Sequence, residues 1–124
     1  MNSRKPESSL NACLPLPPLG ERELLTAPQA GELMTLFKTL ANDTRLRMLH
    51  ALVRAGEMCV SEMSDLLAMK PQAISNQLTR LADRGIVGSR RNGNNIYYRI
   101  VDPCVIEILD HGLCLSEEAK ARSR

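Results

Sequence analysis

The chain has 124 residues, 44% of them hydrophobic and 2% aromatic, and a formal net charge of +2. This length fits one domain, whose core must be aliphatic. No apolar run approaches the roughly 20 residues that cross a bilayer, and the amino terminus lacks the continuous apolar segment of a signal peptide. We therefore expect a cytoplasmic protein without a membrane partner, in which the four cysteines are reduced thiols by default.

The chain is expected to divide into an arm, one domain and a tail. Four prolines fall within residues 1–20, and prolines at this density break helices and strands. Residues 1–26 are therefore predicted to form a flexible N-terminal arm. Residues 27–115 are predicted to fold as the single domain, and residues 116–124 to form a polar C-terminal tail.

The first part of the domain is predicted to contain two helices. Apolar residues recur at helical spacing over residues 33–41, and Pro28 suits the first turn of that helix. The run Asn-Asp-Thr at residues 42–44 offers side-chain oxygens that cap a second helix. We expect this second helix to end near Gly56.

Two further helices are predicted, separated by a turn. The first is short, covers Glu62–Met69, begins after Ser61 as its cap and turns Leu66 toward the core. The second covers Gln72–Asp83, with Pro71 in its first turn. At 100° per residue its apolar side chains gather on one side, and the opposite side is rich in short hydrogen-bonding groups.

The remaining pattern predicts a β-hairpin and a last helix. Residues 86–91 and 96–101 form the two strands, and the Asn-Gly-Asn-Asn run at 92–95 is a strong tight-turn signal. The last helix is predicted to start at Asp102-Pro103. Gly112 is expected to interrupt it.

These elements together predict a DNA-binding protein. Between Met69 and Arg99 the chain carries six basic residues and one acidic residue, which suits a face that meets a polyanion. A short helix, a turn and a polar-faced helix match a helix-turn-helix unit, and an arginine-bearing hairpin can serve as a wing. The residues expected to contact double-stranded DNA are Lys70, Gln72, Ser75, Asn76, Gln77, Thr79, Arg80, Arg90, Arg91 and Asn94.

Two rival classes are disfavoured by the same residues. A protein-interaction module that does not bind DNA is expected to carry acidic or apolar residues on the wing and the polar helix face. A thiol enzyme needs a cysteine with a positioned histidine, and the chain offers only His50 and His111. No phosphate loop or paired carboxylate site is present, so we predict that the chain is not an enzyme.

The sequence also resembles the ArsR/SmtB family of winged-helix repressors over roughly residues 30–110. Leu40–Leu49 is similar to the family's LADPTRLRIL segment, Gln72–Leu78 to its SAVSxHL pattern, and Gly85–Tyr98 to its GLV…RRxG…YY wing. The chain departs from the pattern at Gln77, where histidine is usual. The resemblance implies a mainly α winged helix-turn-helix fold with a small β-hairpin wing, and a homodimer joined through its first and last helices. It also implies an operator-binding repressor that needs no cofactor to bind DNA and is released by an inducer, most often a metal ion.

Cysteines are the candidate inducer ligands, because thiolates suit thiophilic ions of the As, Cd, Hg, Pb or Zn class. Asp102-x-Cys104 and Cys114-x-x-Glu117 resemble the family's metal site on its last helix, with cysteine in place of histidine. Cys59 lies in a segment that resembles the family's ELCVCDL box, and Cys13 of a partner's arm is a further candidate. Two thiols brought together are also able to sense oxidants or reactive sulfur, and this alternative stays open.

Overall fold

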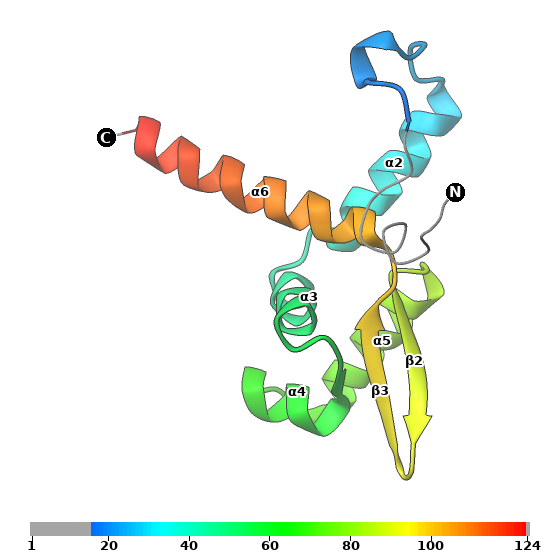
Figure 1. Ribbon diagram of the computed structural model, residues 1–124, viewed down its shortest axis with the longest axis vertical. Coiled ribbons are helices and arrows are strands. Elements are labelled where there is room, and N and C mark those ends of the chain that lie inside the picture. Colours follow the sequence, from blue (N-terminus) through cyan, green and yellow to red (C-terminus); the bar gives the residue numbers. More distant parts are fainter. Residues whose placement is uncertain (1–15, 124) are drawn as a thin grey trace, which may run out of the picture.

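The computed structural model describes residues 16–123, and Figure 1 shows its helices with a β-hairpin that projects at one edge. The elements in chain order are the short 3₁₀ helix η1 (Leu19–Glu21), α2 (Ala27–Leu40), α3 (Asp43–Ala55), β1 (Met58–Cys59), α4 (Val60–Leu67), α5 (Pro71–Asp83), β2 (Val87–Asn92), β3 (Asn95–Ile100) and α6 (Pro103–Arg122). The prediction of a mainly α domain with a β-hairpin is confirmed.

The first two long helices begin where the sequence predicts. The Thr26 hydroxyl accepts a hydrogen bond from the Gln29 amide at 3.2 Å, and the Gln29 side chain accepts one from the Thr26 amide at 2.9 Å. This reciprocal pair satisfies two amides at the start of α2. The Asn42 side chain caps α3 with a single hydrogen bond, which its oxygen accepts from the Arg45 amide at 3.0 Å. Helix α3 ends at Gly56, whose φ of 86° favours glycine.

Helix α4 starts earlier than the sequence predicts. Its first residue is Val60, and the Glu62 carboxylate accepts a hydrogen bond from the Cys59 amide at 3.0 Å. The assignment of Ser61 as the cap is therefore wrong, because the carboxylate one residue further on binds the free amide instead. Leu66 is also wrongly assigned to the core, since it is 57% exposed.

The carboxyl end of α5 is closed by a glycine. Gly85 has a φ of 76°, its amide donates to the Ala82 carbonyl at 2.9 Å, and the Ile86 amide donates to the Leu81 carbonyl at 3.0 Å. These two bonds are the Schellman pattern, which satisfies carbonyls that a helix end leaves open. The chain then turns directly into β2.

The sheet has three antiparallel strands in the order β1-β3-β2. Gly93 and Asn94 form a two-residue turn between β2 and β3, and the φ of 66° at Gly93 fits a type II′ hairpin. Strand β1, in which Met58 pairs with Tyr98 and Cys59 with Tyr97, was not predicted from the sequence. A strand of two residues carries too little alternation to be detected.

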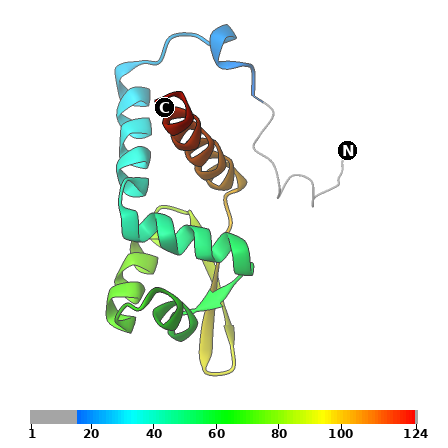
Figure 2. The same cartoon turned by 90° about the vertical axis from the view of Figure 1, so that its left-hand side faces the viewer.

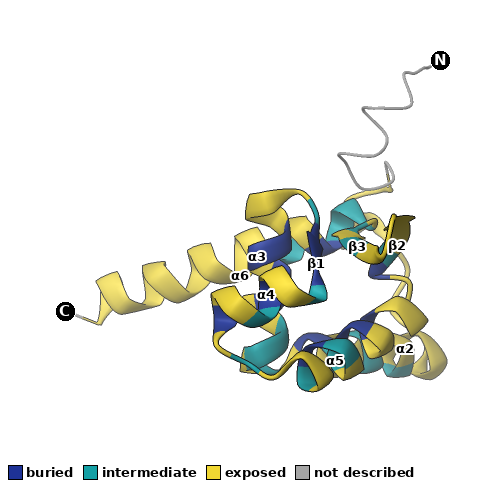
Figure 3. Cartoon of the chain, turned by 90° about the horizontal axis from the view of Figure 1, so that it is seen from below, coloured by how far each residue is buried: buried dark blue, intermediate teal, exposed yellow. Residues whose placement is uncertain are grey.

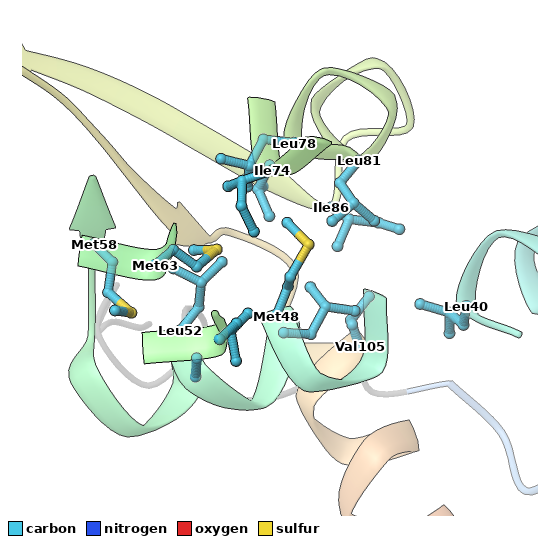
Figure 4. Packing of buried hydrophobic residues seen from close by; sticks show 14 residues of the cluster. Leu40, Met48, Leu52, Met58, Met63, Ile74, Leu78, Leu81, Ile86 and Val105 are labelled. Atoms are coloured by element: carbon cyan, nitrogen blue, oxygen red, sulfur yellow. The ribbon is translucent and has the colours of Figure 1, made fainter. Parts of the chain in front are cut away.

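The core is aliphatic and joins every layer of the domain. Met48 of α3 is fully buried together with Ile74 of α5, and Val105 anchors the start of α6. Figure 4 shows Met48 between the α5 side chains and Val105. Because α5 buries one face in this cluster, its opposite face must point outward.

Helix α6 is longer than the sequence predicts. Asp102 caps it by accepting a hydrogen bond from the Cys104 amide at 2.9 Å, and the helix runs without a break to Arg122. The predicted interruption at Gly112 is wrong, since one glycine costs a helix only about 1 kcal/mol. The residues assigned to a polar tail continue this helix up to Arg122, and Figure 3 shows the exposure of its carboxyl-terminal half.

The domain has two distinct ends. Helices α4 and α5 and the hairpin tip lie at one end, while α2 and α6 extend from the other (Figures 1 and 2). Among residues 16–123, no helix combines the length and the apolar character that spanning a membrane requires.

Candidate nucleic-acid interface and sensor cysteines

The outward face of α5 carries most of the residues predicted to contact DNA. Gln72, Asn76, Thr79 and Arg80 are exposed, whereas Ser75 is half-buried. The Gln72 amide group donates to the Asn76 side-chain oxygen at 3.0 Å, so these two side chains are held side by side. The face therefore presents ordered hydrogen-bonding groups opposite a fully buried side.

The amino end of α5 is suited to a phosphate group. Lys70 precedes the helix, and no side chain caps the first amides. Free amides at a helix start, together with the helix dipole, attract anions. Lys70 and Arg80 are exposed and make no ion pair within residues 16–123, so both positive charges face solvent.

The two wing arginines differ in their surroundings. Arg90 forms an ion pair with Glu57, with one hydrogen bond of 3.0 Å from Nε to a carboxylate oxygen. Its guanidinium also lies over the Tyr97 ring, 5.3 Å from the centroid. The hydrogen bonds from Arg90 lower the pKa of the Glu57 carboxyl below its ordinary value, so the pair stays ionised at neutral pH.

Arg91 lies on the other face of the hairpin. It pairs in register with Ile96, whereas Arg90 pairs with Tyr97, and successive residues of a strand point to opposite faces. Arg91 is exposed and has no ion-pair partner among the described residues. Its charge is thus uncompensated close to the exposed turn residue Asn94.

Gln77 occupies a different environment from the other α5 candidates. It is half-buried, and its side-chain oxygen accepts a hydrogen bond from Arg45 Nε at 2.7 Å. The contact joins α5 to the first turn of α3. Gln77 is therefore engaged inside the protein, although the sequence analysis groups it with residues that contact DNA.

The candidate sensor cysteines lie apart within one chain. Cys104 is half-buried in the first turn of α6 and takes part in a disulfide bond, which contradicts the default expectation of a reduced thiol. Cys114 is a free, exposed thiol, 3.6 Å from a Glu118 carboxylate oxygen. Ten residues of helix separate the two cysteines by about 15 Å, too far to share an ion.

Cys59 is buried in β1, and its sulfur lies 3.2 Å from the Ser61 hydroxyl. Cys13 falls outside the described residues. Within residues 16–123, no three His, Cys, Asp or Glu side chains converge as a metal site. A site built from the described cysteines of one chain alone is not formed.

Known proteins similar to this chain show which family it belongs to. The model of the bacterial regulatory protein arsR family matches residues 42–89. The crystal structure of the AntR antimony-specific transcriptional repressor is similar at 59% identity, with a TM-score of 0.75 over 89% of this chain and 99% of that one. The chain belongs to the arsR family.

Two further similarities extend this assignment. The arsenic resistance transcriptional regulator ArsR1 of Pseudomonas putida is 42% identical over 64% of this chain, which spans 57% of the length of that relative. The homodimeric winged helix-turn-helix DNA-binding domain Mb0332 from Mycobacterium bovis is 27% identical, with a TM-score of 0.68 over 82% of this chain and 95% of that one. This arsR-family chain is a winged helix-turn-helix transcriptional regulator and not an enzyme.

Two polar contacts of this arsR-family regulator were missed by the sequence analysis. Arg45 binds Gln77, 32 residues further along the chain, and Glu57 binds Arg90, 33 residues further. Neither pair has a local sequence signal, since both depend on how separate elements pack. Only the departure from histidine at Gln77 pointed to an unusual environment at that position.

Proposed function

We propose that the chain is a homodimeric repressor that releases operator DNA when a thiophilic metal or metalloid ion binds its cysteine thiolates. Trivalent antimony and arsenic are the first candidates, because AntR is an antimony-specific repressor and ArsR1 is an arsenic resistance regulator. One observation carries the DNA-binding half: α5 buries one face completely and exposes a polar face beside a basic wing. The protein acts in the cytoplasm, where operator DNA lies.

The dimer contact is argued from exposed apolar surface. Phe37 of α2 is 49% exposed and Leu113 of α6 is 56% exposed, and both line one groove with Leu46 of α3. Apolar patches of this kind mark interfaces. A dimer that binds two half-sites one turn of DNA apart needs its two α5 helices about 34 Å apart.

A dimer also allows two sensor cysteines to lie close together, although those of one chain are too far apart. Two α6 helices that cross antiparallel bring Cys104 of one chain near Cys114 of the other. Soft thiolates then converge from two chains, and the ion's preference for that arrangement over the DNA-bound one drives release. Cys59 and Cys13 stay secondary candidates, and Cys59 is disfavoured by its burial.

The test uses fluorescence anisotropy at fixed salt. A labelled duplex is first selected from random DNA by the wild-type chain, and antimonite or arsenite is then titrated. The protein is reduced with a phosphine, because Cys104 is disulfide-bonded and thiol reductants bind the same ions. We expect loss of DNA binding on ion addition, abolished by Cys104→Ser and by Cys114→Ser.

The matched control is Cys59→Ser, which removes a buried thiol and is expected to keep the response. Failure to select any sequence would overturn the DNA-binding proposal. If the protein selects a sequence but responds to neither ion, the DNA-binding proposal stands and the proposed metalloid inducer is wrong.

A second candidate inducer is an oxidant or a reactive sulfur species acting on a cysteine pair. It is favoured by the disulfide at Cys104. Two thiols lose two electrons and two protons to the oxidant as the bond forms. Release by peroxide or polysulfide, reversed by reductant and without any response to antimonite, would support this alternative.

A further inference from the structure

Arg45 connects three helices of the domain. It lies in the first turn of α3, where Nε donates to the Gln77 side-chain oxygen at 2.7 Å and one Nη donates to the Thr39 carbonyl at 3.0 Å. Thr39 lies in the last turn of α2, and Gln77 lies in the middle of α5. One partly buried guanidinium therefore bridges α2 and α5.

The Thr39 end of this bridge is a strong acceptor. Carbonyls in the last turn of a helix lack an intrahelical partner, and the helix dipole makes that end attractive to a cation. Arg84, just after α5, also reaches Thr39, with Nε 3.3 Å from the hydroxyl oxygen. Two arginines thus tie the end of α2 to α5 and its neighbour α3.

The Gln77 end of the bridge limits what this side chain can do on DNA. A bidentate contact to adenine uses both the oxygen and the amide nitrogen of a glutamine. Arg45 donates a charge-assisted hydrogen bond that holds the Gln77 oxygen toward α3, and the side chain is half-buried. Gln72 and Asn76 on the same helix are exposed and better placed for base contacts.

We propose that Arg45 and Gln77 are positioning residues for sequence recognition, which act by fixing α5 relative to α2 and do not contact bases. The proposal rests on the proposed function, and it takes α5 as the helix that enters the major groove, as the second helix of a helix-turn-helix unit does. It implies that losing the bridge lowers preference for the operator and leaves general attraction to DNA intact. Loss of a base contact would instead relax the preference at one base position, and loss of a phosphate contact would reduce the salt dependence of binding.

The test compares operator binding with binding to a nonspecific duplex, over a series of salt concentrations. The variants are Arg45→Ala, Gln77→Ala, the double variant and Gln77→Glu, in the full chain. Arg54→Ala is the matched control, because Arg54 is an exposed arginine in the last turn of α3. The operator probe is the duplex that the wild type selects from random DNA, and each variant also selects its own.

We expect Arg45→Ala and Gln77→Ala each to lower the ratio of specific to nonspecific affinity about tenfold or more, since a charged hydrogen bond is lost. The double variant should lose no more than either single one. Gln77→Glu keeps an acceptor for Arg45 and should keep the ratio, although its charge weakens binding to both duplexes. The salt slope should stay that of the wild type after Arg45→Ala.

Other outcomes overturn the proposal. Relaxed preference at one base position in both Gln77 variants would identify Gln77 as a base contact. A salt slope smaller by about 1 or more after Arg45→Ala would identify a phosphate contact. Additive losses would show two independent roles. Circular dichroism and thermal melting establish that each variant is folded. If Arg45→Ala does not fold, the comparison of Gln77→Ala with Gln77→Glu decides. A wild type that selects no sequence would refute the proposed function itself.

Discussion

The wing offers a quantitative test, because its two adjacent arginines should contribute unequally to DNA binding. Arg90 is paired with Glu57 and lies over Tyr97, whereas Arg91 has no ion-pair partner among the described residues. A cation already neutralised by a carboxylate releases few DNA counterions when it approaches a phosphate. We therefore expect Arg91→Ala to change the salt dependence of binding far more than Arg90→Ala.

The size of the effect follows from counterion release. Each phosphate contact contributes about 0.9 to the slope of log affinity against log salt, and a dimer has two wings. Arg91→Ala should make the slope less negative by about 1.8. The loss of affinity between about 50 mM and about 200 mM salt should then shrink about 12-fold. Arg90→Ala should change the slope by less than half as much.

The assay is anisotropy of a nonspecific duplex over this salt range. Glu57→Gln supplies a test of opposite sign, because it frees Arg90 and should make the slope steeper. Equal slope changes for Arg90→Ala and Arg91→Ala, with no steepening in Glu57→Gln, would refute the division of roles that the ion pair suggests.

Three further expectations follow from the same structure. Leu78→Ala should cost about 2–5 kcal/mol in urea unfolding, whereas Leu66→Ala at an exposed site should cost under about 0.5 kcal/mol. Phe37→Glu with Leu113→Glu should yield monomers in sedimentation velocity; a persisting dimer would relocate the interface. Folding lowers the pKa of Glu57. The ionised Glu57 carboxylate therefore stabilises the folded protein at pH values above its ordinary pKa of 4.5. This stabilisation is lost as the pH falls through the lowered pKa of the folded state. Melting temperatures of wild type and Glu57→Gln should therefore converge in acid, and a constant gap would contradict this.

Local chemistry explains why much of the fold is predictable. The Asn42 cap and the turn at Gly93 are signals contained in a few neighbouring residues, and each appears where it was expected. The polar and apolar faces of α5 follow from helical periodicity alone. The exposed polar face of α5, which we propose faces DNA, was therefore predictable as a surface, whereas the contacts of its individual residues were not.

The unpredicted features depend on tertiary contacts. The hydrogen bond that engages Gln77 comes from another helix, and the ion pair that compensates Arg90 comes from the segment before β1. Strand β1 exists because β3 offers an edge to Met58 and Cys59. Helix α6 passes Gly112 since its other residues sustain the helix.

The claim that an inducer ion is held between two chains is tested most directly by mixed dimers. One chain carries Cys104→Ser and the other Cys114→Ser, with different tags so that the mixed dimer is purified alone. The mixed dimer keeps one intact combination, Cys104 of one chain with Cys114 of the other. Bound antimony is measured by equilibrium dialysis and elemental analysis of reduced protein.

We expect two ions per wild-type dimer, one per mixed dimer and none in either variant homodimer. DNA release in the same samples should follow the bound ion. Full binding in either homodimer, or no recovery in the mixed dimer, would contradict a site shared between Cys104 and Cys114 across the dimer.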